Sequence, residues 1–219
     1  MAKEILSKTQ KQFIDFFKNQ KKLANIFYLT GGTALANYYL HHRYSDDLDF
    51  FTHKENLDGK IALELMEKVK DILDASELTY NKLFDRRIFY LKFTNRDELK
   101  VEFTYYPFKQ LENPKLINNI LVDGFYDLSV NKLFSIIDRS EIKDYVDLYY
   151  ILKKISLEKL RKGVKKKFGA KIEVITLGAK LIEVENFTIL PRMIKKLTLS
   201  KLKTFFLKEG NKLKPKILI

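Results

Sequence analysis

Two aspartates, Asp47 and Asp49, stand two residues apart in the segment HRYSDDLDFF. Side chains alternate along a strand, so both carboxylates point to one face while Leu48 and Phe50 point into a core. Neighbouring carboxylates repel each other unless a cation lies between them. Oxygen ligands on a strand suit Mg²⁺, which also binds substrate phosphate oxygens. The pair indicates a magnesium site, or alternatively a solvated strand end whose acids pair with Arg43 or a lysine.

A glycine turn, Gly31-Gly32-Thr33, precedes these acids and follows a short apolar run. Glycines between a strand and a helix let backbone N–H groups approach a phosphate, and the Thr33 hydroxyl can donate to the same group. Such a turn can also merely cap a helix. On adjacent strands, however, the turn and the carboxylates place a phosphate cradle opposite a metal site.

The elements that must position these residues follow from hydrophobic spacing and turn residues. The predicted strands are 26–29, 48–52, 78–84, 87–94, 100–106 and 120–122, and the first helices are 7–22, 33–41 and 58–73. After Asp127 the pattern is helical over 128–138, 142–155 and 157–168, with two or three further helices broken at Gly169, Pro191 and Gly210. We predict an α+β fold, with a mixed sheet and flanking helices in residues 1–125 and a helical domain in 126–219.

The positive charge is confined to one part of the chain. Residues 151–219 hold 19 Lys or Arg against 5 Asp or Glu, whereas residues 1–150 hold 22 against 23. A basic surface of this kind attracts a polyanion such as RNA or DNA. It can also be a solvated lysine-rich surface without a partner.

Several classes of protein are excluded by composition. The chain has no cysteine, so neither a disulfide framework nor a thiolate metal site is possible, and its three histidines are too few for an all-protein zinc site. The first residues lack the apolar run of a signal peptide, and no run of about 18 apolar residues could span a bilayer. We therefore expect a cytoplasmic protein without membrane association.

Two separated motifs resemble one protein family. GGTAL at residues 31–35 and HRYSDDLDFF at residues 42–51 resemble the AbiEii/AbiGii-type nucleotidyltransferases, and NKLFSIIDRSEIKDYVDLYYIL at residues 131–152 is similar to that family's later block. These proteins are toxins of bacterial abortive-infection systems within the DNA polymerase β-like nucleotidyltransferase superfamily. The resemblance implies a nucleotidyltransferase-type mixed sheet, NTP as substrate, and a separate DNA-binding antitoxin as partner.

The resemblance also implies roles for individual residues. Gly31, Gly32 and Thr33 match the phosphate-binding motif, and Asp47 and Asp49 match the metal-binding carboxylates. Lys132 matches the helix lysine expected at the nucleotide phosphates. Either Asp144 or Asp147 matches the acid of the last motif. Lys132 and Asp147 could instead form a plain salt bridge between two helices.

Three supporting residues complete the predicted site. Glu102 lies on a neighbouring strand, where the superfamily carries a third metal-binding carboxylate; it could equally be an exposed acid paired with Lys100 or Lys92. Arg43 is expected at the nucleotide, where it could hold Asp46 or Asp49 in place. Arg86 and Arg87, at the start of a hairpin strand, could contact phosphate or RNA, or be exposed to solvent.

The predicted function is Mg²⁺-dependent transfer of NMP from an NTP to an acceptor, with release of pyrophosphate. The basic tail favours RNA as the acceptor, such as the 3′ end of a tRNA, in a toxin–antitoxin system of phage defence. One alternative is the same chemistry on a protein or small-molecule hydroxyl. Another is a nucleotide- or RNA-binding module without turnover, although such a module need not keep the repulsive pair Asp47 and Asp49.

Overall fold

The computed structural model describes residues 4–55 and 59–213. The chain forms two compact units. The first comprises Met1–Tyr39, Ser45–Lys109 and Asn113–Gly124, and the second comprises Leu40–Tyr44, Gln110–Glu112 and Phe125–Ile219. The main division lies between Gly124 and Phe125. The two domains drawn from the sequence, 1–125 and 126–219, stay a prediction. Two short segments of the N-terminal half, which the sequence did not distinguish, belong to the second unit.

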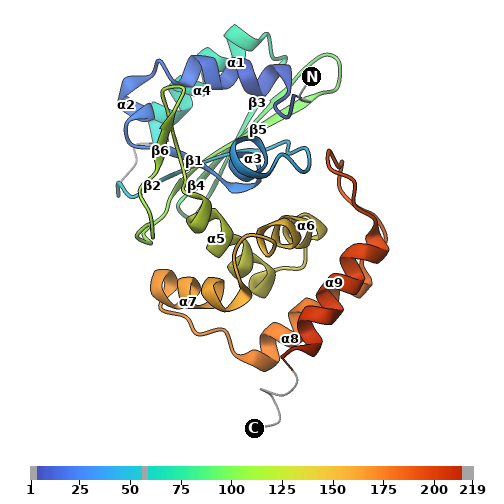
Figure 1. The fold of residues 1–219 in the computed structure, drawn as a ribbon. Coiled ribbons are helices and arrows are strands. Elements are labelled where there is room, and N and C mark those ends of the chain that lie inside the picture. Colours follow the sequence, from blue (N-terminus) through green and yellow to red (C-terminus); the bar gives the residue numbers. More distant parts are fainter. Residues whose placement is uncertain (1–3, 56–58, 214–219) are drawn as a thin grey trace. The chain divides into compact units, whose positions relative to one another are not determined.

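The first unit is built on a mixed sheet in the order β3-β4-β5-β2-β1-β7-β6 (Figure 1). β1 pairs antiparallel with β2 and parallel with β7, while β2 pairs parallel with β5. The two ends of the sheet, β3-β4-β5 and β7-β6, are antiparallel. The strands are β1 (Tyr28–Thr30), β2 (Leu48–Thr52), β3 (Glu77–Leu83), β4 (Arg86–Lys92), β5 (Glu98–Tyr105), β6 (Lys115–Ile117) and β7 (Ile120–Val122).

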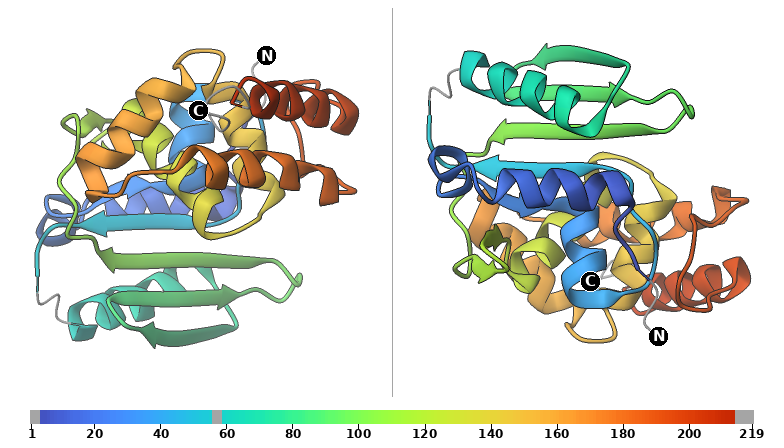
Figure 2. Two further views of the ribbon diagram at one scale, coloured as in Figure 1. Left: turned by 90° about the horizontal axis from the view of Figure 1, so that it is seen from below. Right: turned by 90° about the horizontal axis from the view of Figure 1, so that it is seen from above.

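Helices cover one face of this sheet. Seen from above in Figure 2, α1 (Lys8–Phe17) and α4 (Gly59–Leu73) lie on the same side of the strands. Phe17 of α1 packs on Phe50 of β2 at 4.5 Å between ring centroids, and Phe50 lies 5.4 Å from Phe103 of β5. Because side chains alternate along a strand, Asp49 and Glu102 point to the opposite face.

Two further helices lie before and after β1 in the chain. α2 (Lys21–Ala24) precedes β1, and α3 (Gly31–Leu35) follows it and continues as the π-helix η1 (Ala36–Leu40). α1 begins with a capping box in which the Ser7 hydroxyl accepts from the Gln10 backbone N–H and the Gln10 side chain accepts from the Ser7 N–H.

The second unit is helical. It contains α5 (Phe125–Asp138), α6 (Ile142–Ile151), α7 (Leu157–Phe168), α8 (Val174–Ile182), the 3₁₀ turn η2 (Glu183–Asn186) and α9 (Leu199–Asn211). α5 packs on α6 and α7, and α8 lies beside α9 (Figure 1). The buried Tyr145 ring of α6 contacts Phe187 and Phe206 edge-on, at 5.1 and 5.4 Å between centroids.

A backbone pairing holds the segment Leu40–Tyr44 within the second unit. Arg43 forms an antiparallel bridge with Met193. The His42 carbonyl accepts from the N–H groups of Ile194 and Lys195 at 2.9 and 3.0 Å, and the Tyr44 N–H donates to the Arg192 carbonyl at 2.9 Å. The segment that leads into β2 is thus fixed by residues about 150 positions later in the chain.

The predicted α+β class is confirmed, and most element positions agree to within a few residues. The exceptions have local causes. The predicted helix 7–22 is two helices, because α1 ends at Phe17 before a turn, and the predicted helix 33–41 begins earlier, at Gly31. β6 was not predicted; it pairs with β7 through a tight turn at Asn118 and Asn119, both with positive φ. Gly210 does not break α9, and Asp58 of the predicted helix 58–73 lies outside the described residues.

Candidate active site

Three predicted carboxylates share one face of the sheet in the first unit. Asp49 of β2 is the direct partner of Glu102 in the parallel pairing of β2 with β5, so the two side chains lie next to each other on that face. Asp47 precedes β2 by one residue and follows the same alternation. Its side chain is 38% exposed, whereas that of Glu102 is 5% exposed. Asp47 and Asp49 are therefore both half-exposed, and Glu102 is the buried acid of the three.

Glu102 is held by an arginine rather than by the lysines considered from the sequence. Arg86 Nε and Nη2 donate to the two oxygens of Glu102 at 2.6 and 2.7 Å, and Thr104 Oγ1 lies 2.8 Å from the same carboxylate. Lys100 is more distant, at 3.8 Å. Burial alone would raise the pKa of Glu102, but the hydrogen bonds and the positive charges of Arg86 and Lys100 lower it. Glu102 is ionised and already fully partnered.

Lys100 neutralises the exposed end of the carboxylate face. Its Nζ lies 3.4 Å from Asp47 Oδ2. Burial lowers the pKa of Lys100, but the charges of Asp47, Asp49 and Glu102 outweigh that effect, so its pKa is raised. The protein therefore balances its acids with Lys100 and Arg86.

The glycine turn lies directly against the carboxylates. Gly31 has φ +69°, and a Cβ at this position would overlap the Asp49 carboxylate. Gly31 also begins α3, whose first backbone N–H groups lack partners within the helix. The turn at Gly31 and Gly32 therefore brings a potential anion site against Asp49. The hydroxyl of Thr33, expected at a phosphate, instead donates to the Asp47 carbonyl and ties the turn to the strand.

The donor set suits a hard divalent cation in part. Asp47 and Asp49 offer oxygen ligands on one face, as Mg²⁺ requires. Glu102 would have to release Arg86 before it could act as a ligand, and among residues 4–55 and 59–213 no group of three acids or histidines is arranged to hold a metal ion. The metal-binding roles of Asp47, Asp49 and Glu102 stay a prediction.

The remaining predicted residues meet in a buried ionic cluster of the second unit. Lys132 Nζ of α5 lies 2.7 Å from Asp144 Oδ1 and 2.8 Å from Asp147 Oδ2, both on α6. Arg43 Nε and Nη2 donate to the two oxygens of Asp147 at 2.6 and 2.8 Å. Arg139 Nε donates to Asp144 at 2.8 Å. Both acids that match the last motif therefore bind Lys132, and Arg43 has a partner that was not foreseen.

Charge pairing in this cluster outweighs burial. Burial would raise the pKa of Asp147, but Lys132 and Arg43 hold it well below the usual range. Burial would lower the pKa of Lys132, but Asp147 and Asp144 raise it. These groups are therefore charged, as buried ions are when each has an opposite partner.

His42 is a member of the cluster that the sequence did not identify. Its Nε2 lies 2.7 Å from Asp147 Oδ1, and its ring is fully buried. Burial lowers the pKa of His42 more than Asp147 raises it, so the ring is neutral and donates from Nε2. The Nδ1 atom is buried without a hydrogen-bond partner. Only the adjacency of His42 to Arg43 hinted at this position.

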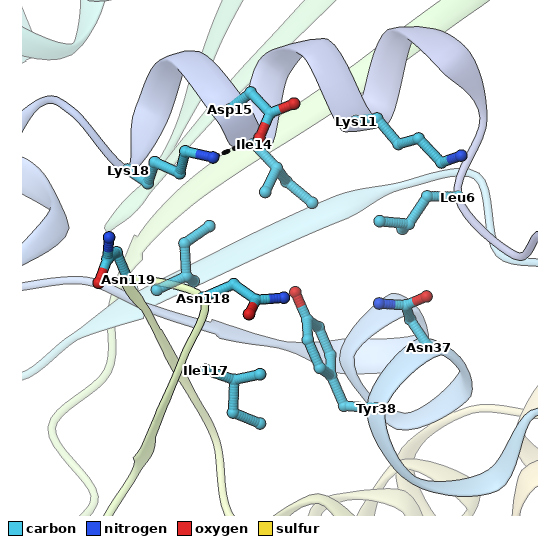
Figure 3. Close-up of a pocket in the computed structure, with 11 residues that line it drawn as sticks. Leu6, Lys11, Ile14, Asp15, Lys18, Asn37, Tyr38, Ile117, Asn118 and Asn119 are labelled. Atoms are coloured by element: carbon cyan, nitrogen blue, oxygen red, sulfur yellow. Dashed lines mark hydrogen bonds and ion pairs between the residues drawn. The ribbon is translucent and has the colours of Figure 1, made fainter.

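A separate pocket of about 540 Å³ lies in the first unit (Figure 3). Its lining comes from α1, from Asn37 and Tyr38 of the π-helix, and from the turn between β6 and β7. None of the carboxylates described above borders it. Within the described part of the chain, no helix has the length and apolar character needed to cross a bilayer.

Solved structures share this fold. JHP933 from Helicobacter pylori has a TM-score of 0.58 at 20% identity, covering 97% of this chain and 94% of that chain. MenT4, a nucleotidyltransferase toxin from Mycobacterium tuberculosis H37Rv, has a TM-score of 0.51 at 13% identity, covering 95% and 86%. At such identities the likeness shows the fold. An uncharacterized protein of Aquifex aeolicus (strain VF5) is 36% identical over 150 residues, which are 67% of this chain and 68% of that protein.

A mixed sheet that sets an Asp-x-Asp pair against a glycine turn is the framework of a nucleotidyltransferase, and this chain is one. The family model described as nucleotidyl transferase AbiEii toxin, type IV toxin–antitoxin system, matches residues 16–212, so the chain belongs to that family. The family predicted from the two motifs is confirmed. Membership implies an NTP as substrate and an antitoxin as partner.

Proposed function

We propose that this toxin transfers NMP from an NTP to a hydroxyl of RNA in a Mg²⁺-dependent reaction, as part of phage defence. The observation that carries the proposal is the contact between the glycine turn and the acids: Gly31 leaves no room for a side chain beside Asp49. A nucleotide phosphate at the start of α3 would therefore lie next to Asp49 and Asp47.

The reaction is a phosphoryl substitution. The acceptor oxygen forms a bond to the α-phosphorus while the bond from that phosphorus to the bridging oxygen of pyrophosphate breaks, and the hydroxyl proton passes to solvent. A bound Mg²⁺ would supply charge neutralisation for the leaving pyrophosphate. Asp47 and Asp49 would hold the ion, and the backbone N–H groups of Gly31 and Gly32 would orient the phosphates. Glu102 would join them as a third ligand only by releasing Arg86.

Lys132 keeps its proposed role at the nucleotide phosphates. An ammonium group has three donors, and the two carboxylates of Asp144 and Asp147 use two of them. The third can serve a phosphate oxygen, for which lysine acts as a point charge. Arg43 would then act at the nucleotide site through Asp147, by fixing the carboxylate that positions Lys132.

Support for RNA as the acceptor comes from the charge of the second unit. Lys162, Lys165 and Lys166 are exposed on α7 and can contact a phosphate backbone. Lys167 is excluded from this role, because its Nζ is buried at 2.7 Å from Asp127 Oδ1. The 3′ end of a tRNA is one acceptor of this kind, and a DNA-binding antitoxin encoded separately is the proposed partner.

Incorporation of labelled NTPs into total RNA, with and without Mg²⁺, tests the proposal. Asp49→Asn removes the charge and keeps the shape, so we expect at least about a 100-fold loss of labelling with an unchanged unfolding midpoint. Glu98→Gln, at the exposed start of β5, is the matched control and should keep full activity. Label on protein instead of RNA would refute the acceptor, and no Mg²⁺-dependent label in any fraction would favour a binding module.

A further inference from the structure

The turn between β3 and β4 exposes a phenylalanine. Leu83 pairs with Arg86, so the connection consists of Phe84 and Asp85 alone. The Phe84 residue is 86% exposed and has φ +51°. This is the first loop position of a two-residue hairpin, where a positive φ favours glycine, asparagine or aspartate.

Folding of the first unit does not account for this residue. A bulky side chain is disfavoured at positive φ, and an exposed ring gains nothing from burial. Glycine or asparagine would form the same turn with less strain. An outlier of this kind points to a role in binding rather than in stability.

The charges around Phe84 indicate what covers it. Lys82, Arg86 and Arg87 flank the turn, with Asp85 as the only acid between residues 82 and 87. Lys82 and Arg86 are exposed along with the ring. An aromatic face among cations suits unpaired nucleic acid, whose bases stack on the ring while its phosphates meet the cations.

The turn is also joined to the carboxylate face. Arg86, two residues from Phe84, holds Glu102 at 2.6 Å, and Glu102 lies beside Asp49. Two residues of extended chain span at most about 7 Å, so the turn begins within a short reach of the arginine that supports the acids. A substrate at Asp49 could therefore extend to Phe84.

We propose that Phe84 is a stacking platform for an unpaired base of the RNA acceptor, with the exposed Lys82 contacting an adjacent phosphate. The proposal deepens the function argued above and rests on RNA being the acceptor. It predicts that recognition at this point depends on the base being unpaired and tolerates any base, because every base has a face that can stack.

Binding of labelled single-stranded RNA to the full chain, measured by fluorescence anisotropy, tests the platform independently of turnover. Phe84→Asn should raise Kd for single-stranded RNA about ten-fold, and leave Kd for duplex RNA unchanged. Phe84→Tyr should retain wild-type affinity. The unfolding midpoint of Phe84→Asn should be equal to or above that of the wild type, because asparagine suits the turn. Leu116→Asn, an apolar residue 68% exposed on the opposite edge strand, is the control and should change neither Kd.

Each other outcome counts against the platform. No RNA binding by the wild type, or an unchanged Kd in Phe84→Asn, would overturn it. A lowered midpoint together with a raised Kd would assign Phe84 a structural role instead. The labelling experiment above is read separately: if the wild type binds RNA through Phe84 but labels no RNA, the proposed transfer fails while the binding surface stands.

Discussion

At the scale of single residues, Gly31 and Gly169 have nearly the same φ angle but different surroundings. Comparing their alanine variants separates the cost of the φ angle from the cost of contact with Asp49. Gly31 has φ +69° and Gly169 has φ +68°, but a Cβ at Gly31 would meet the Asp49 carboxylate and one at Gly169 would meet nothing within 4 Å. A loss of unfolding free energy that Gly31→Ala and Gly169→Ala share comes from the positive φ angle. Any additional loss in Gly31→Ala comes from Asp49.

Gly169→Ala should therefore lower the free energy of unfolding by about 1–2 kcal/mol and leave nucleotidyl transfer intact. Gly31→Ala should lose more stability and about 100-fold in transfer, because a small displacement of a reacting group has effects of that size. Urea unfolding and the labelling assay measure both. Equal stability losses with full activity in Gly31→Ala would show that the packing against Asp49 is irrelevant to the reaction.

Because of His42, we expect the protein to lose stability in mild acid. The pKa of His42 is lowered from 6.5 because the ring is buried, next to Asp147 and the cations Arg43 and Lys132. The unfolded chain then takes up a proton at a higher pH than the folded chain. The contribution of neutral His42 is complete above pH 6.5 and is lost as pH falls through the lowered pKa.

His42→Gln keeps a donor for Asp147 without a titrating ring. We expect this variant to have a shallower decline of unfolding free energy between pH 6.5 and 5 than the wild type, whatever its absolute stability. The acids of the cluster do not interfere, because Asp144 and Asp147 have pKa values lowered from 3.8 and titrate at lower pH. Parallel curves for the two proteins would place the acid sensitivity elsewhere.

At the scale of elements, the segment before β2 depends on residues 192–195. Besides the backbone pairing, Lys195 Nζ donates to the Leu40 carbonyl at 2.6 Å. Lys195→Met should remove this hydrogen bond and lower the free energy of unfolding by about 1 kcal/mol. Lys196→Met, its exposed neighbour, should stay within about 0.5 kcal/mol of the wild type. Urea unfolding of the two variants measures both losses of unfolding free energy. Equal losses would contradict a stabilising hydrogen bond from Lys195 to the Leu40 carbonyl.

The sequence predicts local elements of the fold but not the long-range pairings between them. The glycine turn, the alternation of Asp47 with Leu48, and the long apolar helix α4 are local patterns, and the sequence predicts them well. The order of strands and the choice of ionic partners depend on pairings far apart in the chain. Arg43 and Asp147, for example, are 104 residues apart, and nothing local distinguishes Asp147 from Asp46 as the arginine's partner.

The same limit applies within the candidate site. The sequence placed Glu102 near the acids, because the superfamily that the chain resembles carries a third carboxylate on such a neighbouring strand. It did not identify Arg86 as the group that holds Glu102, since several cations lie on the same strands. Burial decides such cases: with Glu102 only 5% exposed, a bidentate arginine satisfies it better than a lysine.

At the scale of the whole molecule, the net charge of +13 predicts strong salt dependence of RNA binding. Each lysine–phosphate contact should contribute about 0.7 to the slope of log affinity against log salt for a single strand. Replacing both Lys165 and Lys166 with Gln should therefore reduce the slope by about 1.4. Anisotropy titrations at several salt concentrations measure it. Replacing Lys201 and Lys203 on α9 with Gln gives a matched double variant for comparison. Equal slopes for the wild type and the two double variants would refute an RNA-binding face on α7.

The pairing of Leu40–Tyr44 with residues 192–195 has a consequence for biosynthesis. Leu40 and Lys195 are 155 residues apart, and a ribosome adding about 5–20 residues per second needs roughly 8–30 s to pass from one to the other. During that interval the nascent chain already carries the aspartates, but the segment in front of them lacks its native hydrogen-bond partners. A protein built in this order completes that segment only late in its own translation.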